Sequence, residues 1–260
     1  MKQRQIGMFT RVSAIAVLFF LAIPILIIFP LALNSSDYLS FPPQGFSLRW
    51  VTAVLSSPDW IGSSWLSLKI ATMSTGLSVA ISIPTALALV RGKLPFKQGI
   101  YALILLPMIV PNIIAAIAMF FFFADLRFLS AVSAIVLGHV VLSVSIAVII
   151  LSSTLQGVDR RLEQAALSMG ASAFTTFQRV TLPLIYPGIA SAAIFAFLGS
   201  FDELLVAMYL GNHGAVTLPV RIWTSVNFQL DPSIAAVSAL LVLVSVSALL
   251  GANFFSSRSR

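Results

Sequence analysis

Long apolar stretches dominate this chain, and short polar segments separate them. Six such stretches cover residues 12–33, 61–90, 98–123, 131–151, 184–210 and 233–255. A helix needs about 20 apolar residues to cross the hydrocarbon core of a bilayer. Each stretch must be helical, because lipid offers no partner for an unpaired backbone group. The pattern therefore predicts an all-α integral membrane protein with six transmembrane helices.

The composition supports a membrane protein and argues against most enzyme classes. The chain is 59% hydrophobic and only 9% charged, whereas about 25% of the residues in a soluble domain are charged. It has no cysteine and only two histidines, so we expect no metal site. It also lacks the glycine-rich phosphate loop that ends in Lys-Ser/Thr. We therefore expect a membrane protein that is not an enzyme and binds no cofactor itself.

The distribution of lysine and arginine predicts the orientation of the chain. If the N-terminus is cytoplasmic, the cytoplasmic segments hold eleven basic residues: Lys2, Arg4, Arg11, Arg91, Lys93, Lys97, Arg160, Arg161, Arg179, Arg258 and Arg260. The outer segments then hold three: Arg49, Arg127 and Arg221. Basic residues concentrate in cytoplasmic loops, so we expect both termini in the cytoplasm. The net charge of +7 then fits anionic lipid headgroups and does not indicate nucleic acid.

The first apolar stretch could also be interpreted as a cleaved signal peptide. Its apolar run exceeds the 7–15 residues typical of a signal core. We therefore expect an uncleaved helix.

A polar segment at 152–183 is too regular for a simple turn between two spans. Apolar residues recur there at helical spacing: Leu162, Ala165, Ala166 and Met169. Gly170 suits the left-handed conformation that ends a helix, and Ser172 can cap a second short helix. Pro183 suits the first turn of the next span. We expect two short cytoplasmic helices joined at a glycine, although an ordinary amphipathic interfacial helix would have the same spacing.

This segment resembles the loop of bacterial ATP-binding-cassette importer permeases that is named for its Glu-Ala-Ala run. In that family a glycine follows four residues after the run, and a branched apolar residue, any residue, leucine and proline come later. This chain has Gln164-Ala165-Ala166, then Gly170, then Val180-Thr181-Leu182-Pro183. Gln164 occupies the acidic position of the run and Glu163 precedes it, so no salt bridge of the motif glutamate can be inferred.

The resemblance implies that 152–183 forms a coupling helix that docks on a separate ATPase subunit, which holds ATP and magnesium. The residues expected to carry this coupling are Glu163, Gln164, Ala165, Ala166, Met169, Gly170, Ala171 and Pro183. It further implies one transmembrane domain over 1–260 in the bacterial inner membrane. The implied partners are a second, unlike permease, two ATPase subunits and a periplasmic solute-binding protein.

Further segments resemble the second permease of spermidine/putrescine-type importers. They are 41–50, 200–204, 217–221 and 231–232. The resemblance implies a polyamine or another amine or amino-acid-like solute, with an opine, aminobutyrate or aminophosphonate as alternatives. An ion-coupled secondary carrier is the competing class, but the chain shows no inverted repeat.

Four acidic or basic side chains lie within the predicted spans: Lys69, His139, Asp202 and Glu203. An acid inside a span costs roughly 2.5–3.5 kcal/mol on insertion scales, so it normally faces a cavity or a partner. Lys69, His139 and Asp202 lie at a similar depth, roughly 12 Å from the outer ends of their spans. Two interpretations stay open: a buried ion pair between Lys69 or His139 and one acid, or a translocation path that attracts an amine.

Overall fold

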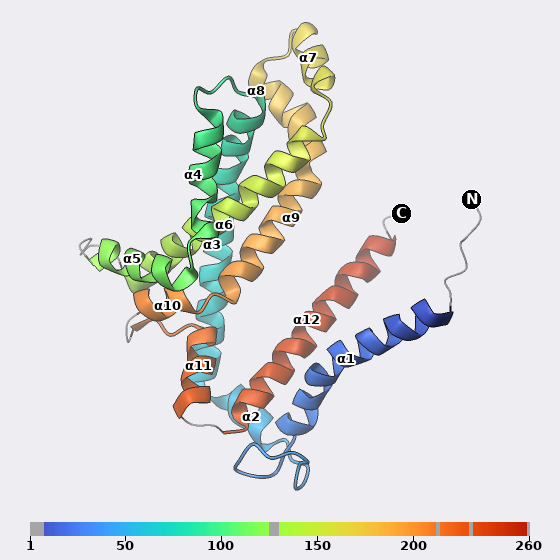
Figure 1. Cartoon of the computed structure of the whole chain (residues 1–260), viewed down its shortest axis with the longest axis vertical. Coiled ribbons are helices and arrows are strands. Elements are labelled where there is room, and N and C mark those ends of the chain that lie inside the picture. Colours follow the sequence, from blue (N-terminus) through green and yellow to red (C-terminus); the bar gives the residue numbers. More distant parts are fainter. Residues whose placement is uncertain (1–7, 125–129, 212–213, 229–230, 259–260) are drawn as a thin grey trace. The chain divides into compact units, whose positions relative to one another are not determined.

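The computed structural model describes residues 8–124, 130–211, 214–228 and 231–258. Apart from one isolated bridge between Asn34 and Phe46, these residues form helices and loops (Figure 1). The chain divides into two compact units, Gly62–Arg221 and a second unit made of Met1–Ile61 and Ile222–Arg260. The fold is therefore all-α, as the apolar pattern predicted.

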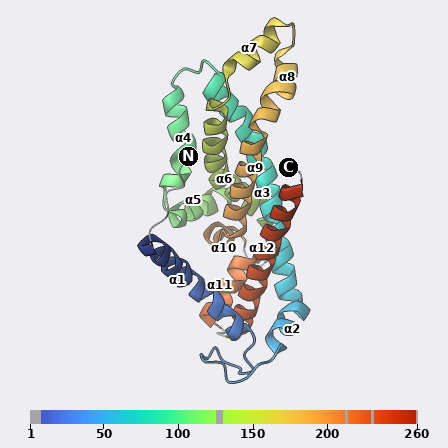
Figure 2. The same ribbon diagram turned by 90° about the vertical axis from the view of Figure 1, so that its right-hand side faces the viewer.

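Three long helices form the frame of the larger unit: α3 (Pro58–Arg91), α6 (Ala131–Gln156) and α9 (Leu182–Phe201). Helix α4 (Lys97–Ile109) lies along α6 (Figures 1 and 2). At one end of this frame, α5 (Asn112–Ala124) packs against α10 (Leu205–Leu210). The polar loop between α6 and α9 lies at the other end (Figure 1).

Small side chains let α3 approach α6 closely. The buried residues of α3 are almost all small, and they include Ser63, Ser67, Ala71, Ser74, Ser78, Ser82 and Ala86. The Ser74 hydroxyl donates to the Val136 carbonyl at 3.3 Å, and the Ser82 hydroxyl donates to the Val144 carbonyl at 3.4 Å. Small and hydroxylated residues are typical of contacts between membrane helices, because they let the backbones meet.

Glycines allow α9 and α10 to pack closely against α6. A Cβ added to Gly188 of α9 would lie 2.3 Å from Oγ1 of Thr154 on α6. A Cβ added to Gly138 of α6 would lie 2.6 Å from a methyl carbon of Val206 on α10. Neither site has room for a side chain, so both helix contacts depend on glycine.

The expected span at 98–123 is not one helix. Helices α4 and α5 are bent by 103° at a break next to Pro111. Val110 is extended, with φ −71° and ψ 131°, since a residue before proline avoids the helical conformation. Pro111 also lacks the N–H that would continue α4.

The expected span at 184–210 is also interrupted. Helix α9 ends at Phe201 and α10 begins at Leu205. The interruption falls on Asp202 and Glu203, so both acids lie at a helix break and not in the middle of a helix. Spacing did not reveal this break, because the apolar pattern continues across it.

By length and composition, four described helices could cross a membrane, or five if α4 and α5 together form one bent span. The four are α1 (Met8–Ala32), α3, α6 and the helical segment Ala173–Phe201. Helix α12 (Ser233–Arg258) contributes a shorter apolar stretch, Ser233–Ser247. The count of six and the orientation remain predictions. Four basic residues used for the orientation lie outside the described residues: Lys2, Arg4, Arg127 and Arg260.

In the smaller unit, α12 packs against both α1 and α2 (Arg49–Ser56). The polar loop between α1 and α2 is organised around Asn34, which is fully buried. The Asn34 amide donates to the Ser40 hydroxyl at 2.9 Å, and its oxygen accepts from the backbone N–H groups of Ser36 and Gln44. The loop contains a cis peptide bond at Phe41-Pro42.

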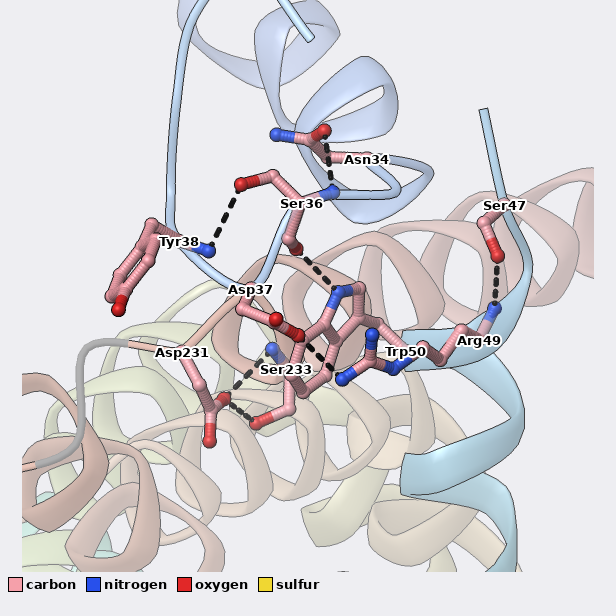
Figure 3. Close-up of polar contacts among 9 residues, drawn as sticks. All are labelled: Asn34, Ser36, Asp37, Tyr38, Ser47, Arg49, Trp50, Asp231 and Ser233. Carbon is pink, nitrogen blue, oxygen red and sulfur yellow. Dashed lines mark hydrogen bonds and ion pairs between the residues drawn. The ribbon is translucent and has the colours of Figure 1, made fainter. Parts of the chain in front are cut away.

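The end of this loop is held at Trp50 (Figure 3). The Trp50 indole donates to the Ser36 carbonyl at 3.0 Å, and the Arg49 guanidinium lies over the Trp50 ring. Arg49 also forms a 2.5 Å ion pair with Asp37. Asp231 caps the start of α12 by accepting from the Ser233 N–H at 2.9 Å. A polar segment thus closes one end of the smaller unit.

Candidate functional site

The loop between α6 and α9 begins with a capped helix. Helix α7 (Arg160–Ser168) starts at Asp159, whose carboxylate accepts from the Arg161 N–H at 2.9 Å. Gly170 follows with φ +87°, a conformation that side chains rarely adopt. The expected helix over this stretch and its end at Gly170 are both confirmed.

The second part of the loop differs from the expectation of a separate short helix. Ser172 does cap α8 (Ala173–Thr176), by accepting from the Thr175 N–H at 3.1 Å. However, α8 continues through a π-helical turn, η1 (Phe177–Thr181), directly into α9. The helix from Ala173 to Phe201 is therefore continuous, and Pro183 lies in its interior as well as in the first turn of α9.

Most of the residues expected to contact an ATPase are accessible in this chain. Gln164, Ala165 and Gly170 are exposed, Ala171 is half-buried, and Met169 is 82% exposed. Two members of the set face inward: Ala166 is buried and Glu163 is largely buried.

Glu163 is held by groups from two other segments. Arg91, the last residue of α3, places its Nε 3.1 Å from Oε2 of Glu163. Thr181 of η1 donates its hydroxyl to Oε1 of Glu163 at 3.2 Å. The Arg91 guanidinium also donates from Nη2 to the Val158 carbonyl at 2.9 Å. The acid next to the expected motif position thus pairs within the chain.

A second site lies at the break between α9 and α10. The Glu203 carboxylate accepts from three consecutive backbone N–H groups at the start of α10, those of Leu205, Val206 and Ala207. The three N···O distances are 3.1, 2.8 and 3.2 Å. These donors have no carbonyl partner within a helix that starts here. Glu203 therefore serves as the cap of α10.

His139 of α6 contacts the same carboxylate. Its Nε2 lies 3.5 Å from Oε2 of Glu203, and the two side chains are 1% and 8% exposed. On the other side of the ring, Nδ1 and the Ser200 hydroxyl are 2.7 Å apart. Nε2 makes no hydrogen bond among the described residues. The imidazole thus joins α6 to the end of α9 and to the start of α10.

Two neighbouring hollows surround this cluster. A cavity of about 210 Å³ is lined by His139, Ser200, Ser143 and Glu203, together with apolar side chains. A more open hollow of about 760 Å³ is lined by Asp202 and Glu203. Five residues line both: Asn112, Ile146, Phe195, Gly199 and Glu203. We call the two together the break cavity.

The two acids have different surroundings. Asp202 is exposed in the wall of the break cavity, and the structure gives its carboxylate no ion-pair partner among the described residues. The Glu203 side chain is only 8% exposed, and both of its carboxylate oxygens accept hydrogen bonds. Lys69, which was predicted as a possible partner, is exposed on α3 and pairs with neither acid in the described part of the chain.

Several residues that contribute to these sites were not predicted from the sequence. Arg91 was recognised only as a topological charge, although it is the partner of Glu163. Ser200 and Asn112 gave no signal, because serine and asparagine in an apolar stretch do not reveal what they face. The two adjacent acids, Asp202 and Glu203, in an otherwise apolar stretch were the available hint of a helix break.

Several apolar helices of membrane-spanning length are typical of a multi-pass membrane protein. The chain belongs to the family of binding-protein-dependent transport system inner membrane components, whose model matches residues 78–260. It is therefore a permease subunit of an importer for a small solute and not an enzyme, as the sequence predicted. The family works with a further permease, an ATPase and a binding protein.

Individual relatives cover most of the chain. The putrescine transport system permease protein PotI of Escherichia coli is 30% identical over 230 residues, which are 86% of this chain and 82% of the relative. The spermidine/putrescine transport system permease protein PotC of the same organism is 27% identical, with 89% and 87% covered. The molybdenum transport system permease protein ModB of Mycobacterium bovis is 33% identical, with 76% and 81% covered.

The same fold occurs in a solved structure. A chain of a bacterial ABC transporter involved in the import of the acidic polysaccharide alginate superposes with a TM-score of 0.76. The alignment covers 99% of this chain and 98% of that chain at 16% identity. At this identity the likeness shows the fold alone.

Proposed function

We propose that this chain is one of two unlike permease subunits of an ATP-driven importer that moves a small cationic amine, of the polyamine class, into the cytoplasm. Six spans with both termini cytoplasmic carry the solute by alternating access. The loop at 152–183 docks on the ATPase, which holds ATP and magnesium. A periplasmic binding protein delivers the solute on the other side of the bacterial inner membrane.

The solute class rests on one observation above all, the exposed carboxylate of Asp202 in the break cavity. A charge at membrane depth is costly unless it faces water or a partner of opposite charge. Glu203 is already occupied by backbone donors, so Asp202 is the acid available to a passing cation. The Asp202 carboxylate in this wall would attract an ammonium group and repel an anion.

The relatives support a polyamine solute but do not by themselves identify it. The putrescine and spermidine/putrescine permeases are 30% and 27% identical to this chain. A permease of a molybdenum system is 33% identical over a shorter stretch. Identity at this level therefore does not choose the solute, and the proposal relies on the acidic residue in the cavity wall. Opines, aminobutyrate and aminophosphonates remain the alternative solutes, because each carries an amino group.

The test is uptake by the complete importer in proteoliposomes, with binding protein loaded with putrescine or spermidine. We expect Asp202→Asn to slow amine uptake by roughly tenfold, which corresponds to the loss of about 1.4 kcal/mol of attraction for the passing cation. ATPase stimulation by loaded binding protein should persist. Asp37→Asn, which removes an exposed carboxylate elsewhere, is the matched control. Undiminished uptake in Asp202→Asn would exclude an amine path at this wall.

A secondary carrier is the alternative class. It would accumulate the solute from an ion gradient without ATP, and no ATPase would purify with it. The continuous helix from the capped loop into α9 favours the importer, because it gives a docked ATPase a rigid element to displace.

A further inference from the structure

The pairing of Arg91 with Glu163 joins two parts of the chain that no backbone connects directly. The loop at 152–183 continues covalently into α6 and α9, so any movement of α7 reaches those helices through the chain itself. Helix α3 has no such connection, because the whole of α4, α5 and α6 separates Arg91 from the loop. Its contact with the loop depends on side chains.

Arg91 is well suited to this contact. Its side chain is 18% exposed and that of Glu163 is 14% exposed. One guanidinium bonds both the Glu163 carboxylate and the Val158 carbonyl, which precedes α7. A planar guanidinium can hold two acceptors in a fixed geometry, whereas a lysine ammonium acts as a point charge. Thr181 extends the cluster to η1 by its bond to Glu163.

The other end of α3 is anchored as well. The Ser67 hydroxyl accepts from the Leu218 N–H at 2.8 Å, and Ser63 accepts from Nε of Arg221 at 3.0 Å. Helix α3 runs without interruption between these anchors and Arg91, through Pro84. At 1.5 Å per residue the anchors are about 40 Å apart. A single helix thus connects the loop with the segment at 217–221.

We propose that the Arg91–Glu163 pair makes α3 and the coupling loop move as one body, so that α3 carries displacement of the loop to the segment at 217–221. This inference rests on the proposed docking of the loop on an ATPase. Arg91 is then a positioning residue. It contacts neither solute nor nucleotide, and it contributes to transport by fixing the position of α3 relative to α7.

Spin labels test the rigid connection directly. The chain has no cysteine, so Leu94→Cys, just beyond α3, and Leu167→Cys on α7 provide the only labelling sites on it. Both positions are exposed. In the complete importer, we expect the distance between the labels to stay the same in the nucleotide-free and ATP-bound states. In Arg91→Gln and Glu163→Gln it should differ between those states or broaden.

Transport gives the second readout. In Arg91→Gln and Glu163→Gln, we expect the solute imported per ATP hydrolysed to fall by about fivefold or more. Arg91→Lys keeps the charge but not both bonds, so it should lie between these variants and the unsubstituted chain. Lys93→Gln removes an exposed charge two residues away and is the matched control. If Arg91→Gln does not assemble, Arg91→Lys and Thr181→Val give the same readouts.

Two results would overturn the proposal. One is a label distance that changes with nucleotide in the unsubstituted chain. The other is an unchanged distance and unchanged solute-to-ATP ratio in Arg91→Gln. Failure of the proposed function would look different, because no ATPase would then purify with the subunit. If import is driven by ATP but α3 moves independently of the loop at 152–183, only the rigid connection is refuted.

Discussion

Nε2 of His139 lies 3.5 Å from Oε2 of Glu203, and this contact joins α6 to the break between α9 and α10. The carboxylate is simultaneously the acceptor for three backbone N–H groups of α10. The structure therefore separates two adjacent acids by role: Glu203 holds the break together, and Asp202 faces the break cavity.

Glu203 should matter for stability. Glu203→Ala leaves the α10 donors without an acceptor, which should lower the free energy of unfolding by about 2 kcal/mol. Glu203→Gln keeps one acceptor oxygen, so it should lower the free energy of unfolding by only about 1 kcal/mol. Thermal unfolding of the subunit in detergent measures both. Asp202→Asn is the matched control and should leave the unfolding midpoint unchanged. Equal losses in Glu203→Ala and Asp202→Asn would contradict the division of roles.

Gly188 should not tolerate a side chain. Gly188→Ala places a Cβ 2.3 Å from Oγ1 of Thr154, and overpacking of this kind costs about 1–3 kcal/mol. Gly199→Ala on the same helix meets nothing within 4 Å, so it should be neutral or slightly stabilising in the isolated subunit. Thermal unfolding of the two variants should separate them clearly. A stable Gly188→Ala protein would show that α9 does not approach α6 this closely.

Gly170 should matter through its backbone. Alanine at φ +87° carries a strain of roughly 1–2 kcal/mol, so Gly170→Ala should distort the corner between α7 and α8. Asparagine adopts positive φ more readily, and Gly170→Asn should retain more activity. ATP-driven uptake is the measurement. Neither variant creates a steric clash, because a Cβ here meets nothing within 4 Å. Equal uptake in the two variants would argue against a conformational role of Gly170.

The loop between α1 and α2 should depend on Asn34 and not on its surface ion pair. Asn34→Ala removes a buried side chain with bonds to Ser36, Ser40 and Gln44, and should cost about 2–3 kcal/mol. Asp37→Ala breaks an exposed ion pair with Arg49 and should cost less than about 1 kcal/mol. Limited proteolysis of the loop reports the difference. Faster cleavage in Asp37→Ala than in Asn34→Ala would reverse this ranking.

The apolar pattern was sufficient to predict the helical class, and it placed several helices well. The expected stretches at 61–90 and 131–151 correspond to α3 and α6 within a few residues. Apolar content is uninformative about breaks, however, because both sides of a break can be apolar. The bend at Pro111 and the interruption at Asp202 therefore escaped prediction, although proline and paired acids were visible there.

The polar loop was more predictable than the cavity. Its glycine corner and Ser172 cap follow from local backbone rules, so the sequence nearby contains the required information. Arg91 lies 72 residues from its ionic partner Glu163, and Ser200 lies 61 residues from its partner His139. Contacts of that kind depend on which helices pack together. The periodicity along one helix does not contain this information.

We propose that a separate ATPase drives this permease through the loop at 152–183. The most direct measurement is the ATPase activity of the complex purified through this subunit, titrated with binding protein loaded with putrescine or spermidine. We expect an ATPase to co-purify and its hydrolysis rate to rise with the amine-loaded form. Absence of any co-purifying ATPase would contradict the claim.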